Sequence, residues 1–337
     1  MKKRKADNTC MDEAMLYRIA KDYYVFGMKE ETIACRENIS RPHVSRLLSI
    51  AKKHGMVRVD VVMPNHEEID RIEPELRQIS HLKYLKVVYV PEEFKSDQRK
   101  TSLDIASEAS EIISEYLVGC RNTGIGWGFT MYETAKQLSY ADSKWGGSFT
   151  PLIGVSSESS PYLQVNTITD HFSEKSFGTA NYTNIPIALD NQQQMSKMEK
   201  SKLKEIETRW SKLDSAIVGL GTPYKKDATF MISEAGSMYK EVLSKDHAVG
   251  DILATFFREN GEIIHMPPAY KIVAIDLNKL MMIPKVLCLA GGNEKVMGIY
   301  TAIRMNYING LVTDSNTAQK LLELFNKNST QKERGVK

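Results

Sequence analysis

The chain contains little cysteine and no long apolar run, and each absence narrows the class of protein. Its cysteines form neither a CxxC pair nor a metal-ligand spacing, so reduced thiols are expected and no metal site is predicted. They are Cys10, Cys35, Cys120 and Cys288. The longest apolar stretch, 280–290, is interrupted by a proline and a lysine and is too short to span a bilayer. The basic residues at the start are not followed by an apolar segment, so no signal peptide is predicted. These features predict a cytoplasmic protein without membrane contact.

Basic and acidic residues nearly balance over the 337 residues, and the net charge of +3 becomes informative only when it is divided along the chain. Residues 1–62 hold 13 Lys and Arg against 8 Asp and Glu, which is a net charge of +5, whereas the remaining residues hold 32 against 34. A small basic head on a mildly acidic body predicts a polyanionic partner for the head alone. The length favours two or three domains with ample core.

Residues 30–49 are typical of two short helices joined by a tight turn. Asn38 lies at the turn, where a left-handed backbone is needed, Ser40 is placed to cap the second helix, and Pro42 suits its first turn. The pattern predicts a helix-turn-helix whose second helix enters the major groove of double-stranded DNA. An ordinary helical hairpin with a solvated basic face is the alternative interpretation. The predicted DNA-binding residues are Ser40, Arg41, Pro42, His43, Ser45, Arg46, Lys52 and Lys53, of which the last two are assigned to phosphates.

Apolar residues at helical spacing before this motif and an alternating segment after it complete the predicted head. The first predicts a support helix that Gly27 ends, and the second, 56–63, predicts a strand that forms a wing. Pro64 and Asn65 mark a domain boundary, so we predict a winged three-helix domain over 1–63 and an effector and oligomerisation domain over 64–337. The segment 66–80 is predicted to be a helix that connects the two or carries dimer contacts.

Strands and helices alternate along the predicted body. Apolar segments typical of buried strands lie at 85–90, 122–127, 149–154, 215–221, 284–292 and 311–314, and helices are predicted over 101–118, from 130, and over 315–326. This alternation predicts an α/β fold with a mostly parallel sheet that is covered by helices on both faces.

Three of these predicted strands lead into glycine-bearing exits, at 124–128, 219–222 and 291–292. Ligands of open α/β sheets bind beyond the carboxyl ends of the strands, where these exits would gather. Exposed backbone N–H groups at such ends, leading into helix N-termini, favour phosphate, although glycines that only permit tight turns are the plainer explanation. The segment GIGWG at 124–128 lacks the GxGxxG spacing, so neither a dinucleotide nor any other cofactor is predicted.

Lys295 is the most informative single residue of the body. It lies in the first turn of a predicted helix after Gly291 and Gly292, where a cation opposes the helix dipole unless an anion lies between them. Asp251 is a candidate acceptor for ligand hydroxyls, or equally a turn residue. No nucleophile–base constellation is visible. The predicted effector-binding residues are Gly124, Gly126, Gly128, Thr130, Gly221, Thr222, Asp251, Gly291, Gly292 and Lys295.

Several segments match, in order, the pattern of a known family. They are EETIA and SRPHVSRLLSIAKKHGMVRVDV in the head, and in the body GIGWG-x-T at 124–130, AIVGLGT at 216–222, VGDI at 249–252, AGGNEKVMGIYTAIR at 290–304 and INGLVTDSNTA at 308–318. On these segments the chain resembles the SorC family of bacterial sugar-responsive transcription regulators, which includes the Bacillus-type deoxyribonucleoside regulators.

The resemblance implies a DNA-binding head, an effector domain with the fold of phosphosugar isomerases and deaminases, and a homo-oligomer, either dimer or tetramer. It also implies a phosphorylated sugar or a related small metabolite as ligand. Some relatives hold a sugar covalently through a lysine near 151–166, but this chain has no lysine there, so no Schiff base is predicted. We therefore expect a regulator of a carbohydrate operon and not an enzyme. The alternatives are a phosphosugar isomerase-like or deaminase-like enzyme with an appended head, and an adaptor whose pocket is vestigial.

Overall fold

Contacts divide the chain into two units, Met1–Pro64 and Asn65–Lys337, which we call the head and the body. The structure, a computed structural model, describes residues 13–57, 66–94, 96–141, 147–157, 159–190, 196–222, 247–265 and 270–334. Among these residues no helix is both long enough and apolar enough to cross a membrane.

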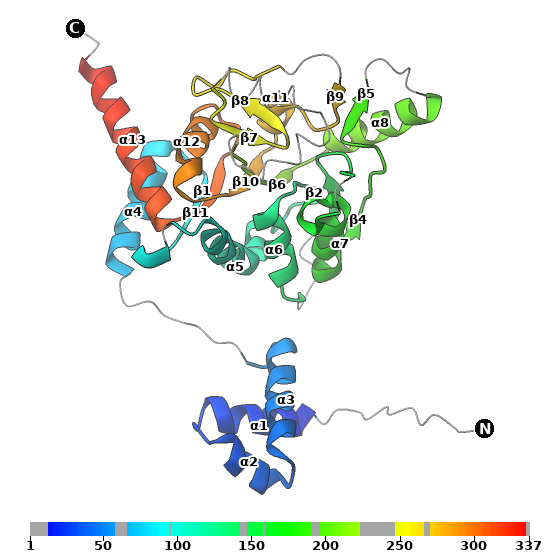
Figure 1. Cartoon of the computed structure of the whole chain (residues 1–337), viewed down its shortest axis with the longest axis vertical. Coiled ribbons are helices and arrows are strands. Elements are labelled where there is room, and N and C mark those ends of the chain that lie inside the picture. The colour runs from blue at the N-terminus through cyan, green and yellow to red at the C-terminus, as the bar shows by residue number, and fades with distance from the viewer. Residues whose placement is uncertain are drawn as a thin grey trace. The chain divides into compact units, whose positions relative to one another are not determined.

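The described residues of the head form three helices that share one apolar core. Figure 1 shows the arrangement of these helices. They are α1 (Glu13–Tyr24), α2 (Glu30–Glu37) and α3 (Arg41–Lys53). Leu16, Ile33 and Val44, one from each helix, are at most 1% exposed and meet in this core. Helix α1 ends at Tyr24, short of the end predicted at Gly27, so Phe26 lies beyond the helix and is exposed.

The turn between α2 and α3 has the predicted left-handed residue. Asn38 has φ 53° and ψ 45°, and its own N–H and that of Ile39 donate to carbonyls of the last turn of α2. Ser40 occupies the N-cap position of α3 with an extended backbone, but its hydroxyl makes no capping hydrogen bond. Pro42 lies in the first turn of α3, as predicted. Residues 58–63 of the predicted wing lie outside the described residues.

The body is organised around a seven-stranded sheet in which every strand pair is parallel. From one edge to the other its strands are β1 (Tyr84–Val88), β11 (Gly310–Asp314), β10 (Lys285–Leu289), β6 (Ser215–Gly219), β2 (Asn122–Ile125), β3 (Ser148–Pro151) and β4 (Thr179–Ala180). The predicted, mostly parallel α/β sheet is therefore confirmed, and strand β4 is an addition that the sequence did not reveal.

Helices cover both faces of this sheet (Figure 1). One face packs against α5 (Gln98–Tyr116), α6 (Phe129–Gln137) and α7 (Val165–Ser176). The other packs against α4 (His66–Ser80), α8 (Lys197–Trp210), α12 (Val296–Arg304) and α13 (Ser315–Arg334). In β6, Ile217 packs on the face covered by α5, α6 and α7, and its neighbours Ala216 and Val218 pack on the opposite face. Because both faces are buried, the central strands are continuous apolar segments in the sequence.

Two small antiparallel pairs lie outside the main sheet. Strand β5 (Ala188–Asp190) pairs with β9 (Tyr270–Ile272), and β7 (Gly250–Ile252) pairs with β8 (Thr255–Phe257), while α11 (Leu277–Leu280) is a single short helix. The turn of the β7–β8 hairpin has positive φ at Leu253 (53°) and Ala254 (60°). Two consecutive residues with positive φ give a tight turn the twist of its flanking strands, but this conformation is unfavourable for any residue with a Cβ atom. The hairpin therefore stores strain, and strain of this kind is concentrated at functional sites.

Candidate functional site

A cavity of about 570 Å³ opens at the carboxyl ends of the central strands, and we call it the effector cavity. The direction in which successive strands are added to the sheet reverses between β2 and β6. Strands β3 and β4 lie beyond β2 on one side, and β10, β11 and β1 lie beyond β6 on the other. Ligand sites of open α/β sheets form at such a switch point. The segments that leave β2, β6 and β10 all contribute to the cavity wall, at 127–131, 219–222 and 295.

The structure brings together six of the ten predicted effector-binding residues. Those that line the cavity are Gly128, Thr130, Gly221, Thr222, Asp251 and Lys295. The other four are Gly124, Gly126, Gly291 and Gly292, which lie behind the wall in buried positions. At Gly124 an added Cβ would lie 2.5 Å from the Leu152 side chain, so this glycine permits close packing.

Helix α6 points its first turn at the cavity. The N–H of Gly126 donates to the carbonyl of Ile217 (2.8 Å), and that of Gly128 donates to Tyr162 (2.9 Å), so both are already engaged. The next three residues, 129–131, have first-turn amides without an intrahelical acceptor, and all three line the cavity. An anion is favoured at this position by the amides and by the helix dipole. Of the predicted positions Gly126, Gly128 and Thr130, the last lies in this turn, whereas the amides of the first two are engaged with backbone carbonyls.

Gly291 and Gly292 hold the loop that positions Lys295. The N–H of Gly292 lies 2.7 Å from Asp314 Oδ2 and 2.8 Å from Thr317 Oγ1, and Gln98 donates to the Gly291 carbonyl at 2.8 Å. Gly292 has φ 97°, which favours glycine. Because these groups are engaged with the protein itself, the contribution of the loop to the cavity is Lys295, at the end of a 3₁₀ turn (Asn293–Lys295) that leads into α12.

Asp251 lies on β7 beside the strained turn. Its Oδ2 accepts from the N–H of Ala254 at 3.2 Å, and a Cβ on Gly221 would lie 2.1 Å from its Oδ1. Position 221 therefore has to be glycine for the carboxylate to take this place. Burial raises the pKa of Asp251 to about 6, against the opposing effects of the Ala254 amide and the charge of Lys295. The Asp251 carboxyl group therefore changes between its protonated and ionised forms at a pH just below neutral.

Sequence reasoning missed Arg99 and an aromatic cluster in the same wall. The Arg99 guanidinium carbon lies 4.8 Å from the centre of the Phe129 ring, and the rings of Phe129 and Tyr162 meet edge to face at 6.3 Å. Within the described lining, Arg99 and Lys295 outnumber the one carboxylate, Asp251, so the net charge there is positive. Arg99 lies in the first turn of α5, but the helix was predicted to begin only at 101, so the signal that singled out Lys295, a cation in the first turn of a helix, did not apply to it.

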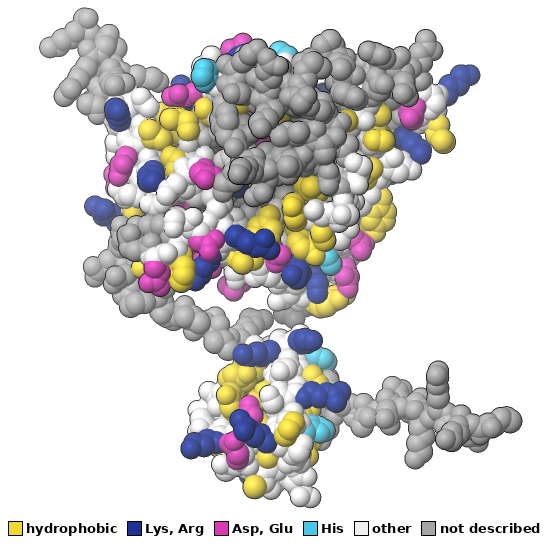
Figure 2. Space-filling model, in the orientation of Figure 1, with side chains coloured by type: hydrophobic (Ala, Val, Ile, Leu, Met, Phe, Trp, Pro, Cys, Tyr) yellow, Lys and Arg dark blue, Asp and Glu magenta, His cyan; other side chains and the backbone are white. Residues whose placement is uncertain are grey.

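All eight predicted DNA-binding residues of the head are exposed. Arg41 is paired with Glu30 (3.3 Å) and Glu31 (3.1 Å), and the Lys52 ammonium lies 5.5 Å from the Tyr24 ring centre. Arg46 and Lys53 form no ion pair with any residue that the structure describes. Figure 2 shows Lys and Arg side chains on the visible surface of the head, among apolar and neutral ones.

These features define a class of protein: an α/β domain with an anion-favouring cavity at its switch point, preceded by a small domain of three helices. Residues 65–323 match the family described as putative sugar-binding domain, and because the match covers most of the chain, the protein belongs to that family.

Its relatives are regulators by name. The chain is 29% identical over 308 residues to the deoxyribonucleoside regulator of Bacillus subtilis, covering 90% of this chain and 95% of that protein. It is 27% identical to the sorbitol operon regulator of Klebsiella pneumoniae, covering 93% and 98% of the two chains. The crystal structure of full-length SorC from Klebsiella pneumoniae matches 92% of this chain and 99% of that one with a TM-score of 0.67. The predicted resemblance to SorC regulators is therefore confirmed.

Proposed function

We propose that the protein is a DNA-binding transcriptional regulator of a carbohydrate operon whose operator affinity is controlled by a phosphorylated sugar. The observation that carries the proposal is the effector cavity, where two cations and the first turn of α6 converge at the switch point of the sheet. The names of the full-length relatives support the regulatory role.

The lining divides into a part suited to phosphate and a part suited to hydroxyls. The phosphate lies against the amides of 129–131, with Lys295 and Arg99 as its counter-charges. The sugar hydroxyls lie nearer Asp251 and the exit of β6 at Gly221 and Thr222. Asp251 in its ionised form only accepts hydrogen bonds, which matches a ligand that presents several O–H groups.

The head supplies operator recognition through the helix-turn-helix formed by α2 and α3. Residues on the exposed side of α3, with Arg46 and His43 foremost, meet base edges in the major groove, and Lys53 meets a backbone phosphate. A single recognition helix reads only a few base pairs, so paired half-sites and a symmetric dimer or tetramer are part of the proposal. The body supplies the oligomer interface.

Control of DNA binding requires that the ligand bind two states of the protein with different affinity, since otherwise no equilibrium shifts. The strained β7–β8 turn belongs to the cavity wall through Leu253 and Ala254 and is the element we assign to this difference.

One observation favours an enzyme as the second candidate. A carboxyl group with a pKa of about 6 beside a lysine is suited to acid–base catalysis, which is the chemistry of a phosphosugar isomerase or deaminase. Steady turnover of a sugar phosphate by the purified protein would establish this alternative. Binding without turnover supports the regulator.

The test measures binding of the protein to duplexes from its own promoter region, by fluorescence anisotropy, with a panel of sugar phosphates and the matching free sugars. We expect one phosphorylated sugar to change operator affinity at least about tenfold and its free sugar to have little effect. Lys295→Ala should keep the operator affinity and lose the response. Lys136→Ala, at the other end of α6 and paired with Glu133 (3.4 Å), is the matched control and should respond like the wild type. A response that survives in Lys295→Ala would contradict the proposed site.

A further inference from the structure

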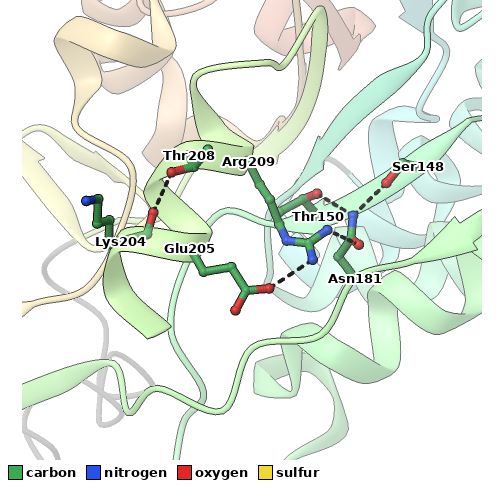
Figure 3. Close-up of polar contacts among 7 residues, drawn as sticks. All are labelled: Ser148, Thr150, Asn181, Lys204, Glu205, Thr208 and Arg209. Carbon is green, nitrogen blue, oxygen red and sulfur yellow. Dashed lines mark hydrogen bonds and ion pairs between the residues drawn. The ribbon is translucent and has the colours of Figure 1, made fainter. Parts of the chain in front are cut away.

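A second cavity, of about 480 Å³, lies at the opposite end of the same strands. It is lined by Asn122 and Ser148, which are the first residues of β2 and β3, so it opens at their amino ends, whereas the effector cavity lies at the carboxyl ends. Helix α8 forms its other wall. Figure 3 shows Arg209 of α8 turned toward Asn181, which in turn faces Ser148 and Thr150 of β3.

The sheet face under α8 is polar at this place, which is unusual for a parallel sheet covered by helices. In β3, Phe149 faces the apolar core and packs against Phe172 with ring centres 6.0 Å apart. Its neighbours Ser148 and Thr150 face the opposite side and line the cavity instead of filling it. Thr150 is only 3% exposed, so its hydroxyl is held in a buried position.

Asn181, just after β4, organises these hydroxyls. Its Nδ2 donates to Ser148 Oγ (2.6 Å) and to Thr150 Oγ1 (2.9 Å), and its Oδ1 accepts from Arg209 of α8 (Figure 3). A guanidinium group can only donate, so the amide atom that faces it is the oxygen, and the orientation of the amide is fixed. Both hydrogens of the Asn181 amide are then directed at the two hydroxyl oxygens.

Each hydroxyl oxygen therefore acts as an acceptor, and each hydroxyl hydrogen needs an acceptor elsewhere. No described residue accepts from Ser148 or Thr150. Thr150 is buried, so its hydroxyl hydrogen gains free energy from an acceptor inside the cavity, whereas the hydroxyl of Ser148 is half-buried. Arg209, which Glu205 also holds at 3.0 Å, and Lys212 add cationic donors, so the lining has a surplus of donors and one net positive charge.

We propose that this cavity is a second ligand site, for a small oxyanion carried as the phosphate or carboxylate group of a metabolite. The oxyanion accepts from the hydroxyls of Ser148 and Thr150, and Arg209 and Lys212 compensate its charge. Among the residues that the structure describes, no aromatic side chain lines the cavity, so this lining lacks the stacking surface that a sugar ring favours. The assignment is independent of the proposed effector cavity.

Calorimetric titration tests the site with inorganic phosphate in one arm and malonate in the other, both against chloride at equal ionic strength. We expect saturable binding of at least one of these anions, weakened about tenfold or more by Thr150→Val, which removes one hydroxyl at nearly constant shape. Ser148→Ala should act in the same direction. The anion that binds with higher affinity shows whether the site prefers phosphate or carboxylate.

Two controls locate the binding. Thr208 lines the same cavity, but its hydroxyl already donates to the Lys204 carbonyl (2.7 Å), so Thr208→Val should bind like the wild type. Lys295→Ala alters only the effector cavity, so any phosphate binding that it removes belongs there, and the binding that Thr150→Val weakens should persist in it. Melting temperatures without anion verify folding, and Ser148→Ala decides the question if Thr150→Val melts early. Absence of saturable binding would mean that water satisfies the hydroxyls, and this result would overturn the proposal. Equal weakening by Thr208→Val, or loss in Lys295→Ala of the binding that depends on Thr150, would also overturn it.

Discussion

Asp251→Asn is expected to stabilise the ligand-free body at neutral pH. Burial raises the pKa of Asp251 to about 6 from an ordinary value of 3.8, so between these pH values the folded protein retains a proton that the unfolded chain has lost. Stability therefore falls as the pH rises through this window and stays lower above it. At roughly 1.4 kcal/mol per pKa unit, the ionised carboxylate costs the folded state about 3 kcal/mol at pH 7. Asparagine removes this cost and keeps an oxygen that can accept from the Ala254 N–H.

The assay is urea unfolding without ligand, at pH 4.5 and pH 7.5, followed by tryptophan fluorescence. All three tryptophans, Trp127, Trp145 and Trp210, belong to the body, so the signal reports on the body alone. We expect Asp251→Asn to exceed the wild type by up to about 3 kcal/mol at pH 7.5 and by less than about 1 kcal/mol at pH 4.5. The same variant should bind the effector more weakly, because an amide accepts less strongly than a carboxylate from ligand hydroxyls.

A variant that is less stable than the wild type at pH 7.5 would refute the argument. So would a difference that does not change between the two pH values, since the predicted gain depends entirely on ionisation. A confirmed gain in stability with a loss of effector binding would show that the cavity keeps a destabilising charge for its function.

Three further predictions concern the cavity, the head and the assembly. Lys295→Ala should lose roughly 1.5–3 kcal/mol of effector binding by calorimetry, the range for charge-assisted hydrogen bonds, and equal affinities would exclude Lys295 as the phosphate counter-charge. Arg46→Ala should reduce the preference for the operator over unrelated DNA, whereas Lys53→Ala should weaken all duplexes alike and lower the salt dependence; unchanged operator binding after both Arg41→Ala and Arg46→Ala would exclude the helix-turn-helix assignment. Native mass spectrometry should show a dimer or tetramer, and a stable monomer at micromolar concentration, with and without DNA, would contradict the model of paired half-sites.

The main sheet could be predicted because its strands are buried on both faces. Six of the seven strands of the main sheet lie at apolar segments of the predicted pattern, and only β4, with two residues, left no such signal. The short pairs β5–β9 and β7–β8 were missed for the same reason, since strands of three residues show no periodicity. Asp251 was therefore selected by its residue type, while its place on a hairpin became clear only from the structure.

The roles of the predicted site glycines depend on tertiary contacts that the sequence alone does not show. Position 221 could be recognised as a glycine exit, but the need for glycine arises from Asp251, which is distant in sequence and 2.1 Å from a hypothetical Cβ. Gly291 and Gly292 looked like phosphate ligands, yet Asp314 and Thr317 on the neighbouring strand and helix engage the Gly292 amide. Contacts of this kind depend on tertiary packing and are not encoded in the spacing of one segment.

The position of β1 has a consequence for the synthesis of the protein. Strand β1 precedes the other strands of the sheet in the chain, but its neighbour in the sheet is β11. Tyr84 therefore cannot pair with Gly310 until the chain has been synthesised to that residue. The head packs only residues close in sequence and can fold while the rest of the chain is still being made. Until translation reaches β11, Leu85 and Val87 belong to an unpaired apolar strand, a template for aggregation. Chains that stop before β11 should therefore carry a folded head on an aggregating remnant, and slow translation of the C-terminal third should lower the soluble yield.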